Sequence, residues 1–298
     1  MSLAALKTDR STKTAIMRVM ISRAQMAQDE LAAHGCQASL HELRKRVKEL
    51  RGMLRLLRPG LKQARIHDGR LRDAARALSP ARDLEVMLGS FDTVTARLRE
   101  PKHFDVLRDR ILARMAATEV QDRHTALRRY AQSIHDLQAD LTDLRLSEKA
   151  SHLLWAGTTK TFRAAQRHQQ AAQDAFAAGP DATPFHEWRK WVKRHWYQAR
   201  FLVMIRPKEM KAHLKSIDTL GLVLGTHNDL DVMMHFLETE AAHSPELDPA
   251  RAIFRRHVLH QRKQLAQEAL DLAQTTLATP PETLIACWQG WWRDWRAA

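Results

Sequence analysis

Two short basic segments, each opening on a histidine, repeat along this chain of 298 residues. Residues 41–48 are H-E-L-R-K-R-V-K and residues 186–193 are H-E-W-R-K-W-V-K, identical at six of eight positions with an offset of 145. Arginine offers phosphate oxygens a planar pair of N–H donors, and lysine offers a mobile positive charge. Histidine donates a hydrogen bond or becomes cationic beside an anion. The repeat therefore predicts two equivalent segments that contact an anion.

Helical projection gives each repeat a basic face and an apolar face. The basic faces hold His41, Arg44, Lys45, Lys48 and Arg55 in the first copy, and His186, Arg189, Lys190, Lys193, Tyr197 and Arg200 in the second. A solvated surface is the simpler interpretation, but solvated faces usually mix both signs of charge, and these contain almost no acid. The histidines fall in the first helical turn, where unpaired N–H groups favour an anion. We therefore expect both basic faces to bind one.

A second, weaker repeat follows each basic segment. It is R-D-L-E-V-M at residues 82–87 and N-D-L-D-V-M at residues 228–233, with an offset of 146. We expect each copy to begin a helix, with Asp83 and Asp229 as N-terminal caps or first-turn carboxylates. Further candidates for contact with the anion are Arg82, His227 and Asn228.

An apolar period near 3.6 residues runs through almost the whole chain, which favours an all-α fold. We predict helices at about 11–34, 40–57, 62–78, 82–99, 103–140, 147–177, 185–205, 208–224, 228–241, 249–277 and 281–296. The repeat divides them into a first half at 1–143 and a second half at 144–298, each an antiparallel helical bundle. The last helix is an addition to the second half, and we expect its tryptophans to clamp onto that bundle: Trp288, Trp291, Trp292 and Trp295.

The overall charge also indicates an anionic partner. With 48 Lys and Arg against 34 Asp and Glu, the formal net charge is +14, which suits nucleic acid, lipid or another polyanion. The chain has no phosphate-binding loop, glycine-rich fingerprint or Ser/His/Asp order, and Cys36 and Cys287 fit no metal or redox spacing. We therefore expect no cofactor, no metal and two reduced, buried thiols. No apolar run approaches the length that spans a bilayer, so we expect a cytoplasmic protein without membrane contact.

At these residues the sequence resembles the CHAD family, the conserved-histidine α-helical domains. The pattern is H-x-x-R-x-x-x-[KR], then a helix opening with [RN]-D-L, and it occurs twice within roughly residues 10–280. The resemblance implies two pseudo-symmetric four-helix-type bundles whose basic helices face a central groove or pore. It also implies binding of inorganic polyphosphate and association with polyphosphate granules. It carries over to His41, Arg44, Lys48 and Arg51, and to His186, Arg189, Lys190, Lys193 and Tyr197.

Several positions depart from the family pattern. Glu49 stands where a second basic residue is common, Arg200 stands where an acid is common, and His195 with Trp196 replaces a typical Leu-Arg pair. The function that we expect is non-catalytic polyphosphate binding, with other polyanions as further partners. The alternatives are an RNA-binding or general polyanion-binding module and, third, an enzyme acting on polyphosphate or triphosphate. Phosphoryl chemistry normally needs carboxylate-held metal ions, which the basic faces do not supply.

Overall fold

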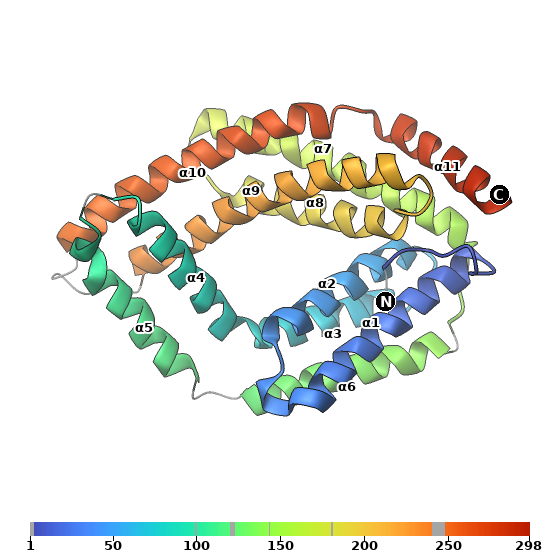
Figure 1. Cartoon of the computed structure of the whole chain (residues 1–298), viewed down its shortest axis with the longest axis horizontal. Helices are drawn as coiled ribbons and strands as arrows, with labels where there is room; N and C mark the ends of the chain where they lie inside the picture. Colours follow the sequence, from blue (N-terminus) through green and yellow to red (C-terminus); the bar gives the residue numbers. More distant parts are fainter. Residues whose placement is uncertain (1–2, 99, 120–122, 143, 180, 240–247) are drawn as a thin grey trace.

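The computed structural model describes residues 3–98, 100–119, 123–142, 144–179, 181–239 and 248–298, and all regular structure among them is helical (Figure 1). The helices are α1 (Thr12–His34), α2 (Leu40–Leu57), α3 (Ala64–Ala77), α4 (Ser79–Thr95), α5 (Asp105–Glu119), α6 (Arg123–Thr142), α7 (Ala150–Ala178), α8 (Thr183–Phe201), α9 (Pro207–Thr239), α10 (Asp248–Thr276) and α11 (Pro281–Ala297), with 3-10 helices at Gly35–Gln37 and Pro101–Phe104. The prediction of an all-α protein is confirmed.

Helices α1, α2, α3 and α6 pack against one another as a four-helix bundle. Leu43, Leu50 and Leu54 recur at helical spacing on α2 and are fully buried in this bundle. The Ser39 hydroxyl accepts a hydrogen bond from the N–H of Glu42 at 3.4 Å, which satisfies one of the unpaired donors at the start of α2. With its apolar face in the bundle, α2 leaves its basic face outside the core.

Helices α7, α8, α9 and α10 form a second bundle in the same manner. Trp188 and Val192 of α8 are fully buried there, against Phe162 of α7 and Leu220 of α9. Because the repeat places Trp188 at the position equivalent to Leu43, α8 buries the face that corresponds to the buried face of α2. The basic face of α8 consequently also lies outside the core.

The helices of the two sequence halves meet on two sides. On one side α2 crosses α7 and α8 closely: a Cβ atom at Gly52 would lie 3.2 Å from Cβ of Tyr197, and one at Gly157 would lie 2.9 Å from the side chain of Leu56. On the other side α4 and α5 pack against α9 and α10. The four helices α2, α4, α8 and α9 therefore border the middle of the molecule (Figure 1).

Several predicted helix boundaries are wrong. The predicted helices 208–224 and 228–241 are one helix, α9, because buried Leu224 and Leu230 continue its apolar face and no proline interrupts it. Asp229 thus lies in the middle of a helix, and Asp83 lies one turn inside α4, so neither is a helix cap. The predicted helix 103–140 is divided into the second 3-10 helix, α5 and α6.

The C-terminal helix α11 packs along α7, and its Trp288 meets the rings of His195 of α8 and His213 of α9, with ring centres 5.6 and 5.1 Å apart, in agreement with the predicted clamp onto the second bundle. Trp288 is 1% exposed, and the rings of Trp155 and Trp292 meet edge to face at 5.9 Å. Cys287 is a free and exposed thiol, which corrects its predicted burial, while the Cys36 side chain lies outside the described residues. The boundary near residue 143 stays a prediction. No described helix has the length and apolarity needed to cross a bilayer.

Candidate anion-binding cavity

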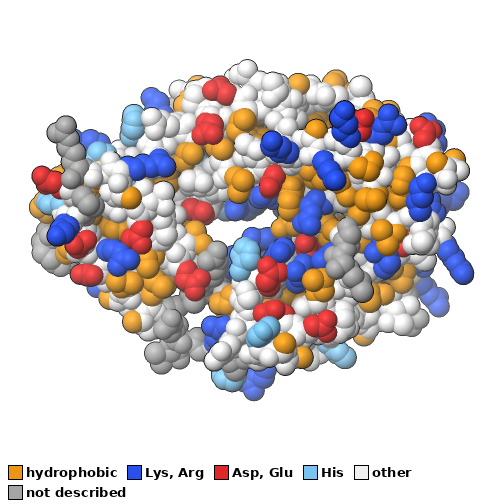
Figure 2. All heavy atoms as spheres, viewed as in Figure 1, with side chains coloured by type: hydrophobic (Ala, Val, Ile, Leu, Met, Phe, Trp, Pro, Cys, Tyr) orange, Lys and Arg blue, Asp and Glu red, His pale blue; other side chains and the backbone are white. Residues whose placement is uncertain are grey.

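A cavity of about 760 Å³ lies between α2, α4, α8 and α9. Figure 2 shows an opening at this place, with charged side chains and histidine around it. Most of the predicted residues line the cavity: His41, Arg44, Lys45, Lys48, His186, Arg189, Lys193, Tyr197, Arg200 and Asn228. Among the described residues, its lining has six Lys and Arg against two acids, Asp83 and Asp229, so its charge is strongly positive.

Both copies of each repeat contribute equivalent residues to this one cavity. The histidine, first arginine and second lysine of the basic repeat line it from both halves, as do the first aspartate and the valine of the weaker repeat. Sequence reasoning assigned the two aspartates a capping role and so missed their place in the site. The matched pair of D-L-x-V-M segments was the signal that could have found them.

The first-half wall is built around Arg44. Its Nη2 atom lies 3.6 Å from Oδ1 of Asp83, and its Nη1 donates a 3.4 Å hydrogen bond to the carbonyl of Ala75. Asp83 is 54% exposed, so water screens this ion pair and makes it weak. Lys45 pairs with Glu42 at 3.1 Å, again near the surface. These cations can therefore exchange their present contacts for those of a bound anion at small cost.

The second-half wall is built around Arg189, whose buried Nε has no hydrogen-bond partner among the described residues. Burial raises the pKa of Asp229, while the charge of Arg189 acts in the opposite direction. A buried donor without an acceptor costs free energy, so an anion whose oxygen accepts a hydrogen bond from this Nε–H would bind more tightly. His186 Nδ1 makes a short hydrogen bond with Oδ1 of Asn228, which ties the start of α8 to α9.

Two glycines on α9 make room for the cations of α8. A Cβ atom at Gly221 would lie 3.1 Å from Cε of Lys193, and one at Gly225 would lie 3.5 Å from Nε of Arg189. The spacing of four residues puts both glycines on one face of α9, along which the two long side chains lie. Sequence reasoning missed both glycines, although the G-L-V-L-G segment was a visible signal.

Two of the cavity's cations, Lys193 and Arg200, lie over the rings of Trp196. Lys193 Nζ lies 5.0 Å and the Arg200 guanidinium carbon lies 4.6 Å from the centre of its rings, within cation–π range. Lys193 also pairs with Asp218 at 3.0 Å. Burial raises the pKa of Tyr197 to about 12, so its phenol stays neutral and can donate a hydrogen bond.

The departures at Glu49 and Arg200 compensate each other. Arg200 Nη1 lies 3.5 Å from Oε1 of Glu49, whose other oxygen lies 2.8 Å from Nη1 of Arg46 and 3.6 Å from Nε of Arg23. Glu49 is 1% exposed, and its carboxylate forms ion pairs with one arginine from each of α1, α2 and α8. The ion pair of Glu49 with Arg200 joins α2 of the first repeat to α8 of the second.

The other predicted site residues lie elsewhere. Arg51 and Arg55 pair with Asp68 at 2.8 and 3.3 Å, near the point where α8 lies against α2 at Gly52. Lys190 pairs with Glu187 at 2.6 Å. His227 lines a different cavity. The side chain of Arg82 lies outside the described residues. Within the described part of the chain, no three His, Cys, Asp or Glu side chains are grouped so as to hold a metal ion.

The sequence and the fold are both similar to those of known proteins. The CHAD domain family model matches residues 15–238. Among solved structures, the fold is similar to a CHAD domain from the plant Ricinus communis, at 23% identity over 93% of this chain and 95% of that chain, with a TM-score of 0.70. It is also similar to PptA from Streptomyces chartreusis, at 18% identity over 90% of this chain and 98% of that chain, with a TM-score of 0.61. A search of curated proteins gave no match. The family model covers most of the chain and both basic repeats, and the chain therefore belongs to the CHAD domain family.

Proposed function

We propose that this protein binds inorganic polyphosphate in the cavity between α2, α4, α8 and α9, without catalysing its turnover. The observation that carries the proposal is the convergence of cations from both repeats on one cavity of about 760 Å³. Like charges held together repel, and a protein gains from such an arrangement when an anion neutralises it. The family to which the chain belongs, together with the resemblance in its repeats, supports the same ligand.

The binding that we propose uses charge-assisted hydrogen bonds. Arg44 and Arg189, one from each half, would each hold two phosphate oxygens through a guanidinium fork. Lys48 and Lys193 would follow the chain as mobile charges. Asp229, whose pKa burial already raises, gives up its charge more easily than an ordinary carboxyl when phosphates approach.

A repeating ligand suits a repeating site. We propose that the two halves are pseudo-symmetric bundles and that each presents the same histidine, arginine and lysine set to successive phosphates of one linear chain. The offset of 145 between the basic repeats, and their joint presence around one cavity, support this arrangement. A cytoplasmic location, with association to polyphosphate granules, follows as part of the same proposal.

RNA is the rival ligand, and one observation argues against it. Single-stranded RNA binders usually offer aromatic faces on which bases stack. Among the described residues the cavity has two aromatic side chains besides histidine, but Lys193 and Arg200 lie over the rings of Trp196, and Tyr197 is half-buried. The phosphate backbone of RNA could still contact the cations, which would make RNA a weaker ligand of the same site.

The direct test replaces Arg44, Lys48, Arg189 and Lys193 together with alanine. We expect tight polyphosphate binding to be lost while circular dichroism and the melting temperature change little, since all four side chains lie outside the cores. A matched control removes four exposed cations around the start of α9: Arg206, Lys208, Lys211 and Lys215. Equal loss in both variants would contradict the cavity as the binding site. Release of phosphate from polyphosphate with Mg²⁺ or Mn²⁺ would contradict the non-catalytic part.

A further inference from the structure

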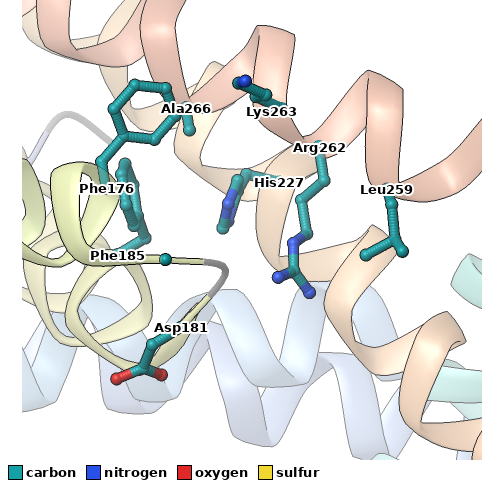
Figure 3. Close-up of a pocket in the computed structure, with 9 residues that line it drawn as sticks. Phe176, Asp181, Phe185, His227, Leu259, Arg262, Lys263 and Ala266 are labelled. Carbon is teal, nitrogen blue, oxygen red and sulfur yellow. The ribbon is translucent and has the colours of Figure 1, made fainter.

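A second cavity, of about 330 Å³, lies where the end of α7 and the start of α8 meet α9 and α10 (Figure 3). It is lined by Phe176, Gly179, Asp181, Phe185, His227, Leu259, Arg262, Lys263 and Ala266. Neither the proposed function nor the repeats account for it. Its volume is at the lower end of the range of small-molecule sites.

This cavity is separate from the basic cavity, although the two share a wall. No described residue lines both. Phe185 and His227 face the second cavity, stacked with ring centres 4.7 Å apart. Their chain neighbours His186 and Asn228 face the basic cavity and are hydrogen-bonded to each other. A ligand in the second cavity would thus lie one residue away from the polyphosphate site on both α8 and α9.

The walls are mainly apolar and aromatic. Phe176 and Phe185 lie on one side, and Leu259 and Ala266 line the cavity from α10. In the view of Figure 3, His227 lies between the two phenylalanine side chains and Arg262. A planar ring inserted here would contact aromatic faces and aliphatic carbon, which favours an aromatic body over a hydrated polyanion.

The polar groups in this cavity have different roles. His227 is 3% exposed, and burial lowers its pKa to about 4, with a smaller effect of Arg262. The imidazole is therefore neutral near pH 7, with one N–H donor and one acceptor, and it makes no hydrogen bond to a described residue. Asp181 is engaged elsewhere, because its Oδ1 accepts the N–H of Thr183 at 2.9 Å. In Figure 3 its carboxylate points away from the other labelled side chains.

Two cationic side chains of α10, Arg262 and Lys263, line this cavity. Arg262 is buried and pairs with Asp231 at 2.7 Å, so its charge is largely balanced. Lys263 is exposed and makes no ion pair with a described residue, which leaves its ammonium group available to a ligand. The cavity therefore combines an apolar interior with a Lys263 ammonium that has no ion-pair partner among the described residues, while the carboxylate of its lining, Asp181, points away from the other labelled side chains (Figure 3).

We infer that this cavity binds a small planar aromatic molecule that carries one carboxylate. The ring lies against Phe176 and Phe185, the carboxylate is held by the Lys263 ammonium beside Arg262, and the neutral imidazole of His227 hydrogen-bonds a polar atom of the ligand. A polyanion would be disfavoured by the apolar walls, and a neutral molecule would leave the charge of Lys263 unused. The inference does not rest on polyphosphate binding.

The test titrates the full chain with naphthalene-2-carboxylate by calorimetry, with the neutral amide of the same ring as comparison. We expect saturable binding of one carboxylate per chain, and about tenfold weaker binding of the amide because the charge-assisted contact is lost. Lys263→Glu should weaken the carboxylate by about tenfold or more. The matched control, Lys211→Glu, makes the same charge change at an exposed position of α9 and should leave the affinity as it was.

Three results would overturn the inference. One is the absence of saturable binding at millimolar naphthalene-2-carboxylate. Another is an affinity that Lys263→Glu and Phe176→Ala both leave unchanged. The third is binding that Lys193→Ala abolishes, because Lys193 lines the basic cavity and that loss would place the probe there. Since Lys263 is exposed and Phe176 lies near the end of α7, neither variant removes a fully buried side chain.

Discussion

Lys193 and Lys190 provide a sharp comparison, because the same charge is removed from the same helix inside and outside the basic cavity. Lys193 lines the cavity, whereas Lys190 pairs with Glu187 outside it. Single-stranded nucleic acids provide the analogy for the effect of salt on polyphosphate binding. If all six cations of the cavity contact phosphates, a plot of log affinity against log salt concentration should have a slope of about −4. Lys193→Ala should reduce the size of this slope by about 0.7.

The difference is large enough to measure. A fourfold increase in salt should weaken binding by about 300-fold for the original chain and by about 100-fold for Lys193→Ala. Fluorescence anisotropy with end-labelled polyphosphate at several salt concentrations gives both slopes. Lys193→Ala should change the folding stability too little to affect the measured slope, since the ion pair of Lys193 with Asp218 is partly exposed and contributes about 1 kcal/mol or less.

Lys190→Ala is the control, and it should keep the original slope. Equal slopes for the original chain and Lys193→Ala would refute the argument, because they would mean that the Lys193 ammonium contacts no phosphate. A larger effect of Lys190→Ala would place the ligand on the other side of α8.

Three further predictions concern other groups. Glu49→Gln should lower the free energy of unfolding by about 3–5 kcal/mol in urea denaturation, because it leaves three arginines around an uncharged group; a loss below about 1 kcal/mol would contradict this. Asp83→Asn should tighten polyphosphate binding about twofold to fivefold in a titration, because Arg44 loses a competing partner; weaker binding would show that the aspartate assists. Burial lowers the pKa of His213 and of His227 from 6.5 to about 4. As the pH decreases through this range, these imidazoles take up protons in the unfolded chain before they do so in the folded one. The free energy of unfolding should therefore fall between about pH 6.5 and about pH 4, by about 3 kcal/mol for each imidazole. Urea titrations across that range check this, and a flat profile would contradict it.

The repeats made much of the fold and of the site predictable from sequence. The helix 40–57 and its basic face followed from periodicity, and ten predicted residues do line one cavity. Projection failed for Arg55, and the family resemblance failed for Arg51, since neither can show that α8 lies against α2 at Gly52. The cavity roles of Asp83 and Asp229 were missed for a similar reason, because both depend on where α4 and α9 lie relative to the basic helices.

The second cavity shows a further limit of sequence reasoning. His227 and Asn228 were both predicted to contact the anion, yet consecutive residues of a helix point in different directions. Asn228 faces the basic cavity and His227 faces the other one. Only the packing of α9 between α8 and α10 decides which residue faces which cavity.

The most direct measurement is a calorimetric titration with long-chain polyphosphate, beside single-stranded RNA of equal charge, at low and at high salt. We expect tight polyphosphate binding that weakens steeply with salt, and weaker RNA binding, since Lys193 and Arg200 lie over the rings of Trp196 and Tyr197 is half-buried. RNA binding as tight as polyphosphate binding, or tighter, would contradict polyphosphate as the ligand of this cavity.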